Sequence, residues 1–216
     1  AEYELSSEFV GKRVFPVYVS FNRSSLINTD DPLQFQHWML ARLCARIVRT
    51  LHGAGLIVGQ VQGMSILSGG SLSAVPDQTT VMEQLVQRYE DSWKSGPTII
   101  DTSSLPSIDD FRDAVEDICS SLHMERIVLL IDEAAHILLP KQQRQFFTLF
   151  RDLRSPYITC KAAVYPGVTS YGDTFQPSHD ATMLSFDRDI LGANYVDIMR
   201  EIVEKQADSR TLGNIA

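Results

Sequence analysis

The chain has 216 residues and a formal net charge of −8, from 27 acidic and 19 basic side chains. Its composition, 44% hydrophobic and 21% charged, is that of a globular protein with one sizeable core, and it excludes wholesale disorder. The negative charge argues against a nucleic-acid clamp in this segment, because phosphate contacts need clustered Lys and Arg. No apolar stretch approaches the length of a membrane span, so no membrane partner is expected.

The cysteines indicate a reducing compartment. Cys44, Cys119 and Cys160 are widely spaced, odd in number and set among apolar residues. This arrangement fits neither a disulfide framework nor a zinc site. The first residues carry acids rather than the basic start of a signal peptide. We therefore predict a cytoplasmic protein whose cysteines are reduced core residues.

A strand and a long helix are predicted first. Residues 14–21 (VFPVYVSF) are rich in β-branched and aromatic side chains, which favours a strand, and Pro16 within it fits an edge position. Asp31 and Pro32 then supply a helix cap and a proline at the first helical position. The spacing of the apolar residues that follow predicts a helix from about Leu33 to His52.

The next part of the chain is predicted to be irregular and then helical. From 53 to 78, short apolar pieces are separated by Gly55, Gly59, Gly63, Gly69 and Gly70, which predicts a loop or a small hairpin. Two helices follow, and each begins with a capping box, Thr80 with Glu83 and Ser107 with Asp110. Their apolar stripes are expected to face the core.

The last third predicts a helix from about Lys141 to Leu153, strands at 158–165 and 182–186, and a closing helix from Asn194 to Ala207. Strands separated by helices require crossover connections and a parallel sheet. The predicted fold class is therefore α/β, with three layers and about four strands. We expect neighbouring strands in the order 14–21, 127–131 and 158–165, with 182–186 apart or shifted.

The most informative motif is a run of five aliphatic residues, 127–131, that ends in Asp132 and Glu133. Such a run suits a strand buried on both faces of a parallel sheet, and open α/β sheets bind ligands beyond the carboxyl ends of their strands. Two carboxylates there are costly to bury unless a cation or a reaction needs them. The pattern resembles the Walker B motif of P-loop ATPases. We assign Asp132 to Mg²⁺ and Glu133 to the attacking water; the alternative is a core strand that ends in a surface Asp-Glu pair.

Other residues near this motif are candidates for the same site. His136 would face the same side of the following turn, where it could contact a phosphate or relay to Glu133, or serve only as a histidine of a helical turn. Polar groups at the tip of the strand next to Walker B sense the γ-phosphate in this class. Tyr165, Thr169 and Ser170 are the choices here, and Tyr165 is the one that ends the predicted strand.

Two arginines are candidates for a role between subunits. Arg151 and Arg154 come at the end of the helix predicted after the Asp-Glu strand. In ring-forming or paired ATPases, arginines near this place can reach a neighbour's γ-phosphate. The alternative is a solvated helix terminus, where cations are favoured by the helix dipole.

Three segments, IVLLIDEAAHILL, QQRQFFTLFRDLRS and TCKAAVYPGVTSYG, together resemble the initiator-type AAA+ and related STAND ATPases. More closely, they resemble the prokaryotic ATPases described as origin-recognition-like. The resemblance covers roughly residues 10–205, and AVYPGVTSYG is its more family-specific signature. It implies a partial P-loop ATPase core over 1–190 and, over 191–216, a helix that leads to a lid or a following domain. It also implies further domains in the same protein and a possible homo-oligomer.

The chain departs from that family because it contains no Gly-x-x-x-x-Gly-Lys-Ser/Thr, the loop that cradles phosphates. In the family the strand bearing that loop lies in the middle of the sheet, and removing it would leave unpaired backbone groups. The chain also begins at Ala1, without an initiator Met, in what looks like the tail of a helix. We therefore expect the phosphate-binding segment upstream of Ala1; its loss from this family member is the alternative.

These patterns predict an ATP-binding and ATP-hydrolysing module, with Mg²⁺ and ATP as cofactors, in a larger ATPase that drives a conformational or assembly switch. The 216 residues by themselves are expected to be weak or inactive in catalysis. Two alternatives remain: a non-catalytic interaction module that keeps the strand only as fold, and a DNA-loading initiator whose basic winged-helix domain follows Ala216.

Overall fold

The computed structural model describes residues 11, 13–29, 31, 33–56, 61–70, 80–95, 99–132, 134, 139–165, 167–185 and 195–206. The chain divides into two compact units, 1–176 and 177–216. The first unit contains β1 (Val14–Ser20), the 3-10 helix η1 (Ser24–Leu26), α2 (Gln34–Gly53), α3 (Gln62–Leu67), α4 (Val81–Ser95), α5 (Ile108–Ser121), β2 (Arg126–Asp132), α6 (Pro140–Asp152) and β3 (Ile158–Ala162). The second unit contains α7 (Pro177–Asp180) and α8 (Tyr195–Gln206).

The three described strands form one parallel sheet in the order β1-β2-β3. Ser20 is the partner of Asp132 at the carboxyl ends of β1 and β2, and Ile127 is the partner of Ile158 near the amino ends of β2 and β3. The prediction that 127–131 is a central strand with parallel neighbours is therefore confirmed. So is the α/β class in its coarse form.

Two predicted strands need correction. The strand predicted at 158–165 ends at Ala162. Residues 182–185 form no strand, and residue 186 lies outside the described residues. Met183 is 50% exposed and Leu184 is 73% exposed, so this apolar run has no buried face. A short apolar run becomes a strand only when a neighbour pairs with its backbone.

The glycine-rich segment also differs from its prediction, because residues 62–67 form the short helix α3 rather than part of a loop or hairpin. Gly63 allows this helix to pack closely against α5. A Cβ atom at this position would collide with the backbone carbonyl of Ala114 in α5. The Gly63 N–H donates to Asp117 Oδ2 at 2.8 Å. Glycine therefore serves here as a close-packing residue between two helices rather than as a breaker.

The long helices agree with their predictions to within a residue or two, and both capping boxes are present. The Asp110 N–H donates to Ser107 Oγ at 3.1 Å, and the Ser107 N–H donates to Asp110 Oδ2 at 3.2 Å. Thr80 and Glu83 make the equivalent pair of bonds, at 2.9 and 3.1 Å. These local bonds satisfy N–H groups that a helix start would otherwise leave unpaired.

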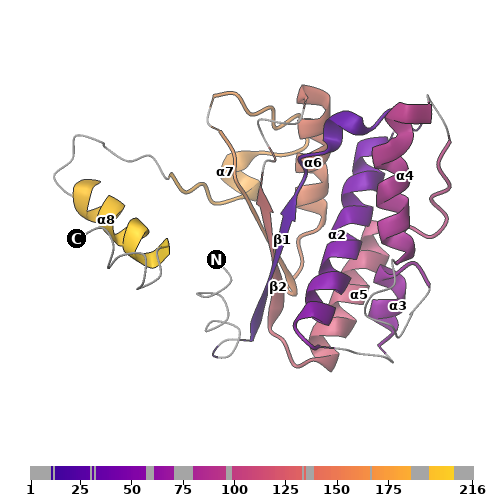
Figure 1. Ribbon diagram of the computed structural model, residues 1–216, viewed down its shortest axis with the longest axis horizontal. Helices are drawn as coiled ribbons and strands as arrows, with labels where there is room; N and C mark the ends of the chain where they lie inside the picture. Colours follow the sequence, from indigo (N-terminus) through magenta and orange to yellow (C-terminus); the bar gives the residue numbers. More distant parts are fainter. Residues whose placement is uncertain are drawn as a thin grey trace, which may run out of the picture. The chain divides into compact units, whose positions relative to one another are not determined.

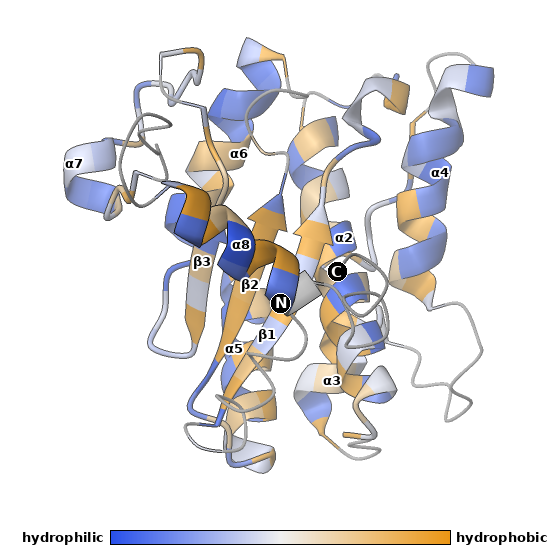
Figure 2. Ribbon diagram, turned by 60° about the vertical axis from the view of Figure 1, so that its left-hand side comes forward, coloured by the Kyte–Doolittle hydropathy of each residue, from blue (hydrophilic) through white to orange (hydrophobic). Residues whose placement is uncertain are grey.

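The described helices that pack on the sheet in the first unit lie on one of its faces. Figures 1 and 2 show α2, α5 and α6 on the same side of the three strands, with α4 outside α2 and α3 beside α5. Successive parallel strands added in one direction by crossovers of the same hand put their helices on the same face. The largest fully buried side chains of this layer include Trp38, Phe21, Phe111, Phe146, Met39, Leu43, Ile47 and Leu51.

The opposite face of the sheet is covered by no described helix of the first unit. The alternation of β1 is visible in its burial, because Val17 and Val19 are buried while Tyr18 between them is 48% exposed. Leu130, the register partner of Tyr18, is half-buried on the same open face. Of the three predicted layers, the described part of this unit therefore shows the sheet and one helical layer.

The outer edge of β1 is closed by side chains of α2. Arg42 Nε donates to the carbonyl of Ser20 at 2.6 Å, and Arg46 Nε donates to the carbonyl of Tyr18 at 2.8 Å. The backbone of Pro16 faces the same outer edge as those of Tyr18 and Ser20, because the three residues are two apart along the strand. Pro16 has no N–H that could donate at this edge. The edge position predicted for Pro16 is confirmed, and these arginines occupy the acceptors that an added strand would need.

The cysteines are free thiols. Cys44 and Cys119 are buried, whereas Cys160 in β3 is only half-buried. Burial raises the pKa of the Cys119 thiol to about 11. Among the described helices, none combines the length and the apolar character needed to cross a membrane.

We predict that Gly63→Ala destabilises the fold by about 1–3 kcal/mol, the usual cost of overpacking, because the new methyl group must push α3 away from α5. Urea unfolding followed by circular dichroism measures this loss. Gly53→Ala is the matched control, since no atom lies within 4 Å of a Cβ built at Gly53. If both variants were equally stable, the close contact between α3 and α5 would not constrain the fold.

Candidate functional site

Asp132 is the last residue of β2, at the carboxyl edge of the sheet. Its carboxylate belongs to the open face, because Ile131 before it is buried towards the helices and strand residues alternate. The half-buried Asp132 thus lies where parallel sheets present groups to a ligand. Among the residues assigned to the site from sequence, Asp132 is the one that the structure places at this edge by backbone pairing.

Tyr18 binds the Asp132 carboxylate from the neighbouring strand. Its hydroxyl donates to Asp132 Oδ2 at 2.8 Å. Tyr18 is paired in register with Leu130, so it reaches Asp132 diagonally, two residues further along β2 on the same face. This bond orients one oxygen of the carboxylate, because a hydroxyl donates a single hydrogen bond along a defined direction.

Tyr165 lies beyond the end of β3, in the turn that follows the strand. It is 56% exposed, and its carbonyl accepts a hydrogen bond from Thr169 Oγ1 at 2.7 Å. The Ser170 N–H donates to Gln143 Oε1 at 2.6 Å. The turn is therefore anchored on the first part of α6, and parallel pairing brings it to the same edge of the sheet as Asp132.

The segment after this turn runs along the outside of α6. Tyr171 and Phe175 pack on Phe147, with ring centroids 4.7 and 5.0 Å away. Gly172 has φ +77°, and a Cβ built there would lie 2.8 Å from Cγ of Arg144. Part of the signature AVYPGVTSYG therefore has a packing role, because its final glycine allows the chain to pass closely over α6.

Arg151 and Arg154 lie at the other end of α6. The helix leaves the carboxyl edge after β2 and returns to the amino edge before β3, so its last turn is remote from Asp132 within this chain. Arg151 Nε donates to Asp152 at 2.8 Å, and Arg151 Nη1 donates to the carbonyl of Thr174 at 2.7 Å. Arg151 thus fastens the segment after β3 to the end of α6.

Glu133 and His136 lie outside the described residues, so their assigned roles stay predictions. Ala134 between them is fully buried. Within the described ranges, no group of three or more His, Cys, Asp or Glu side chains could hold a metal ion. A single carboxylate fits Mg²⁺ nevertheless, because Mg²⁺ keeps several waters and is bound by one or two carboxylates together with substrate phosphates.

No family model, no curated protein and no solved structure matches the chain.

The sequence reasoning missed Tyr18 and a set of arginines on α2. A signal existed for both. Tyr18 and Ser20 are two residues apart in β1, so their side chains lie on the same face of the sheet. Ser20 is the last residue of β1, as Asp132 is of β2, and Tyr18 has a polar hydroxyl that can reach this edge. Arg42, Arg46 and Arg49 recur at helical spacing within a stripe otherwise assigned to the core.

We predict that Tyr18→Phe lowers stability by about 0.5–1.5 kcal/mol, the net value of one hydrogen bond, without changing the fold. The phenyl ring keeps the packing of β1 and removes only the donor to Asp132. Chemical unfolding of the double-mutant cycle with Asp132→Asn tests the pairing, because the effect of Tyr18→Phe should shrink when the charged acceptor is absent. Simple additivity of the two substitutions would show that the charge of Asp132 adds nothing to this bond.

Proposed function

We propose that this chain is the nucleotide-hydrolysis part of a P-loop ATPase of the AAA+ or STAND type. The observation that carries the proposal is Asp132 at the carboxyl end of the central strand of a parallel sheet, with its carboxylate on the open face and held by Tyr18. In this reading ATP turnover drives a conformational or assembly switch in a larger protein. Asp132 would hold Mg²⁺, and Glu133 would orient the attacking water.

The open parts of the sheet support a missing phosphate-binding element. β3 is the last strand in the described order, and after Ile158 its residues Thr159, Cys160 and Ala162 are only half-buried while Lys161 is exposed. One further strand beside β3, followed by a helix across the open face, would complete three layers. The strand, loop and helix of a Walker A segment have this form, and the 216 residues contain no Gly-Lys-Ser/Thr.

Tyr18 has a positioning role in this proposal. A magnesium ion held by Asp132 would neutralise phosphate charge when ATP is bound. The bond from Tyr18 restricts rotation of the Asp132 carboxylate and so directs its other oxygen. Groups that orient a metal ligand in this way change metal affinity when they are removed.

We predict that the 216 residues alone bind Mg-ATP weakly and that the chain extended upstream to include its phosphate-binding segment binds it far more tightly. Most phosphate contacts come from that loop, whereas Asp132 acts through the metal. Isothermal titration of the two proteins measures the difference. Tight, micromolar-range binding by the short chain would place the nucleotide elsewhere.

We further predict that, in the extended chain, Glu133→Gln abolishes hydrolysis and keeps ATP bound, while Asp132→Ala weakens Mg²⁺-dependent binding itself. Glutamine has nearly the same shape as glutamate and cannot polarise water as a carboxylate does, so only the chemical step fails. Steady-state hydrolysis and equilibrium ATP binding are measured for both variants. Near wild-type hydrolysis by Glu133→Gln would favour the non-catalytic interaction module.

A further inference from the structure

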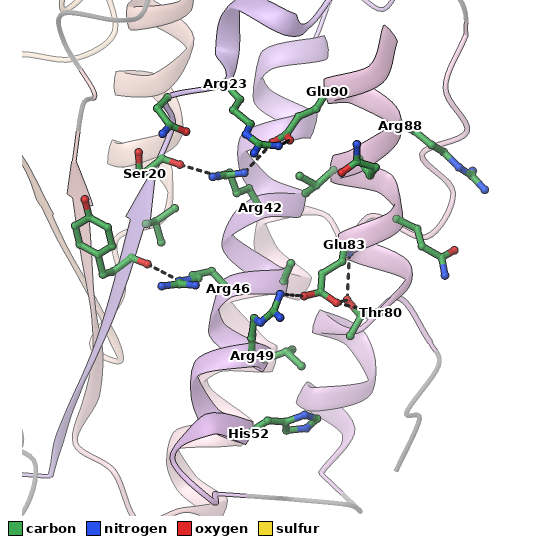
Figure 3. A pocket seen from close by; sticks show the side chains of 18 of the residues that line it. Ser20, Arg23, Arg42, Arg46, Arg49, His52, Thr80, Glu83, Arg88 and Glu90 are labelled. Atoms are coloured by element: carbon green, nitrogen blue, oxygen red, sulfur yellow. Dashed lines mark hydrogen bonds and ion pairs between the residues drawn. The ribbon is translucent and has the colours of Figure 1, made fainter. Parts of the chain in front are cut away.

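A groove runs along the outer edge of β1, between α2 and α4. Figure 3 shows α2 in the middle, with β1 to its left and α4 to its right, and all three elements contribute residues to the lining. Its charged lining consists of Arg23, Arg42, Arg46, Arg49, Arg88, Glu83 and Glu90, with His52 at one end. The arginines outnumber the glutamates by three, in a chain whose net charge is −8. This groove is therefore a local concentration of positive charge on an acidic protein.

Part of this positive charge is already matched by carboxylates of α4. Glu90 accepts from Arg42 at 2.8 Å and from Arg23 at 2.9 Å, and it is almost fully buried. Glu83 accepts from Arg49 at 3.0 Å. The groove thus binds carboxylates within its own structure, which is the recognition that the planar guanidinium favours.

The remaining charge has no such partner among the described residues. Arg46 lies between Arg42 and Arg49 on α2, and no described carboxylate comes within 4 Å of it or of Arg88. Arg46 is exposed, and its Nε is held by the carbonyl of Tyr18. That bond fixes the side chain and leaves its two terminal nitrogens as donors, so an incoming anion meets a guanidinium that is already oriented.

A helix of this chain carries the complementary pattern. Asp109, Asp113 and Glu116 are exposed on α5 at positions i, i+4 and i+7, the spacing of Arg42, Arg46 and Arg49 on α2. Asp109 has an ion pair with Arg112, whereas no described cation pairs with Asp113 or Glu116. No residue of α5 lines the groove, so the two stripes lie on separate surfaces of one molecule.

We propose that the arginine groove of one copy of this chain receives the α5 acidic stripe of a second copy. Arg46 would bind Asp113 through its terminal nitrogens, and Arg49, which is 73% exposed and bonded to Glu83 through Nη1, would bind Glu116 through its remaining donors. Side-chain contacts rather than an added strand would join the copies, because Arg42 and Arg46 occupy the edge of β1. Two molecules of charge −8 repel each other in most orientations. Association should therefore favour the orientation in which the groove of one copy faces the acidic stripe of the other.

A polynucleotide fits the groove less well than a carboxylate stripe. Single strands are held by aromatic side chains on which bases stack, together with positive charge. Tyr18 is the exposed aromatic residue in the groove lining, and its hydroxyl is engaged by Asp132 on the open face of the sheet. The net charge of the chain opposes phosphate backbones as a whole.

Charge reversal on each side, followed by mixing, tests the proposal. The groove variant is Arg46→Glu with Arg49→Glu, and the stripe variant is Asp113→Arg with Glu116→Arg. Sedimentation velocity over a concentration series should show self-association of the wild type and a monomer for each variant. An equimolar mixture of the two variants should form a one-to-one complex with a Kd within about tenfold of the wild-type value, because the native groove of the stripe variant still meets the native stripe of the groove variant, and the two reversed surfaces are also opposite in charge.

The control is Lys141→Glu with Arg144→Glu, which makes the same change in net charge on exposed positions of α6 outside the groove. It should associate as the wild type does. Salt titration is a poorer test, since salt screens both the local attraction and the repulsion between the copies. Recovery of the complex in the mixture also shows that both variants are folded.

Three results would overturn the proposal. The first is a wild type that stays monomeric at every concentration. The second is a stripe variant that still associates while the groove variant does not, which would give the groove another occupant. The third is binding of a labelled single-stranded oligonucleotide, measured by fluorescence anisotropy, that is lost in the groove variant without any self-association of the wild type.

Discussion

The parallel pairing of β2 with both of its neighbours is the constraint on which the rest of the structure depends. It forces the chain to return to the amino edge of the sheet after each strand, and α2 to α6 are those returns. It also brings the carboxyl ends of all three strands to one edge, so Ser20, Asp132 and the turn after Ala162 become neighbours although they are far apart in sequence. A candidate site arises there because backbone hydrogen bonds, rather than side chains, bring its residues together.

The two outer edges of the sheet differ in whether side chains bond their backbone groups. At β1, Arg42 and Arg46 bond the outward carbonyls, and Pro16 removes an outward donor. At β3, the described residues include no comparable cap, and Lys161, the register partner of Leu130, is exposed on the open face of the sheet. Unprotected strand edges invite pairing, so proteins normally close or cover them. The sheet is therefore closed to extension on one side and suited to extension on the other, which is the side where a Walker A strand would be added.

The sequence predicted best those features that local interactions determine. The capping boxes at Thr80 and Ser107 form within four residues, and the apolar run 127–131 predicts a central strand from its own composition. The end of β3, the absence of a strand at 182–185 and the helix at Gly63 depend on which distant segment lies alongside, and spacing alone carries no such information. Asp132 could be assigned from its position after the run. Tyr18 could not, because its bond to Asp132 spans 114 positions and depends on strand register.

Tyr18 connects the two surfaces for which a function is proposed. Its carbonyl accepts from Arg46 in the groove, and its hydroxyl donates to Asp132 at the carboxyl edge. A partner that drew Arg46 towards its own carboxylates would weaken the bond to the carbonyl and change the restraint on this part of β1. Two bonds from one residue can couple the two surfaces. Coupling also requires that this part of β1 have two conformations, and that binding at either surface shift the equilibrium between them. The carboxyl end of β1 is the part of this fold best able to adopt two conformations, because two side-chain bonds, instead of a second strand, hold its outer edge.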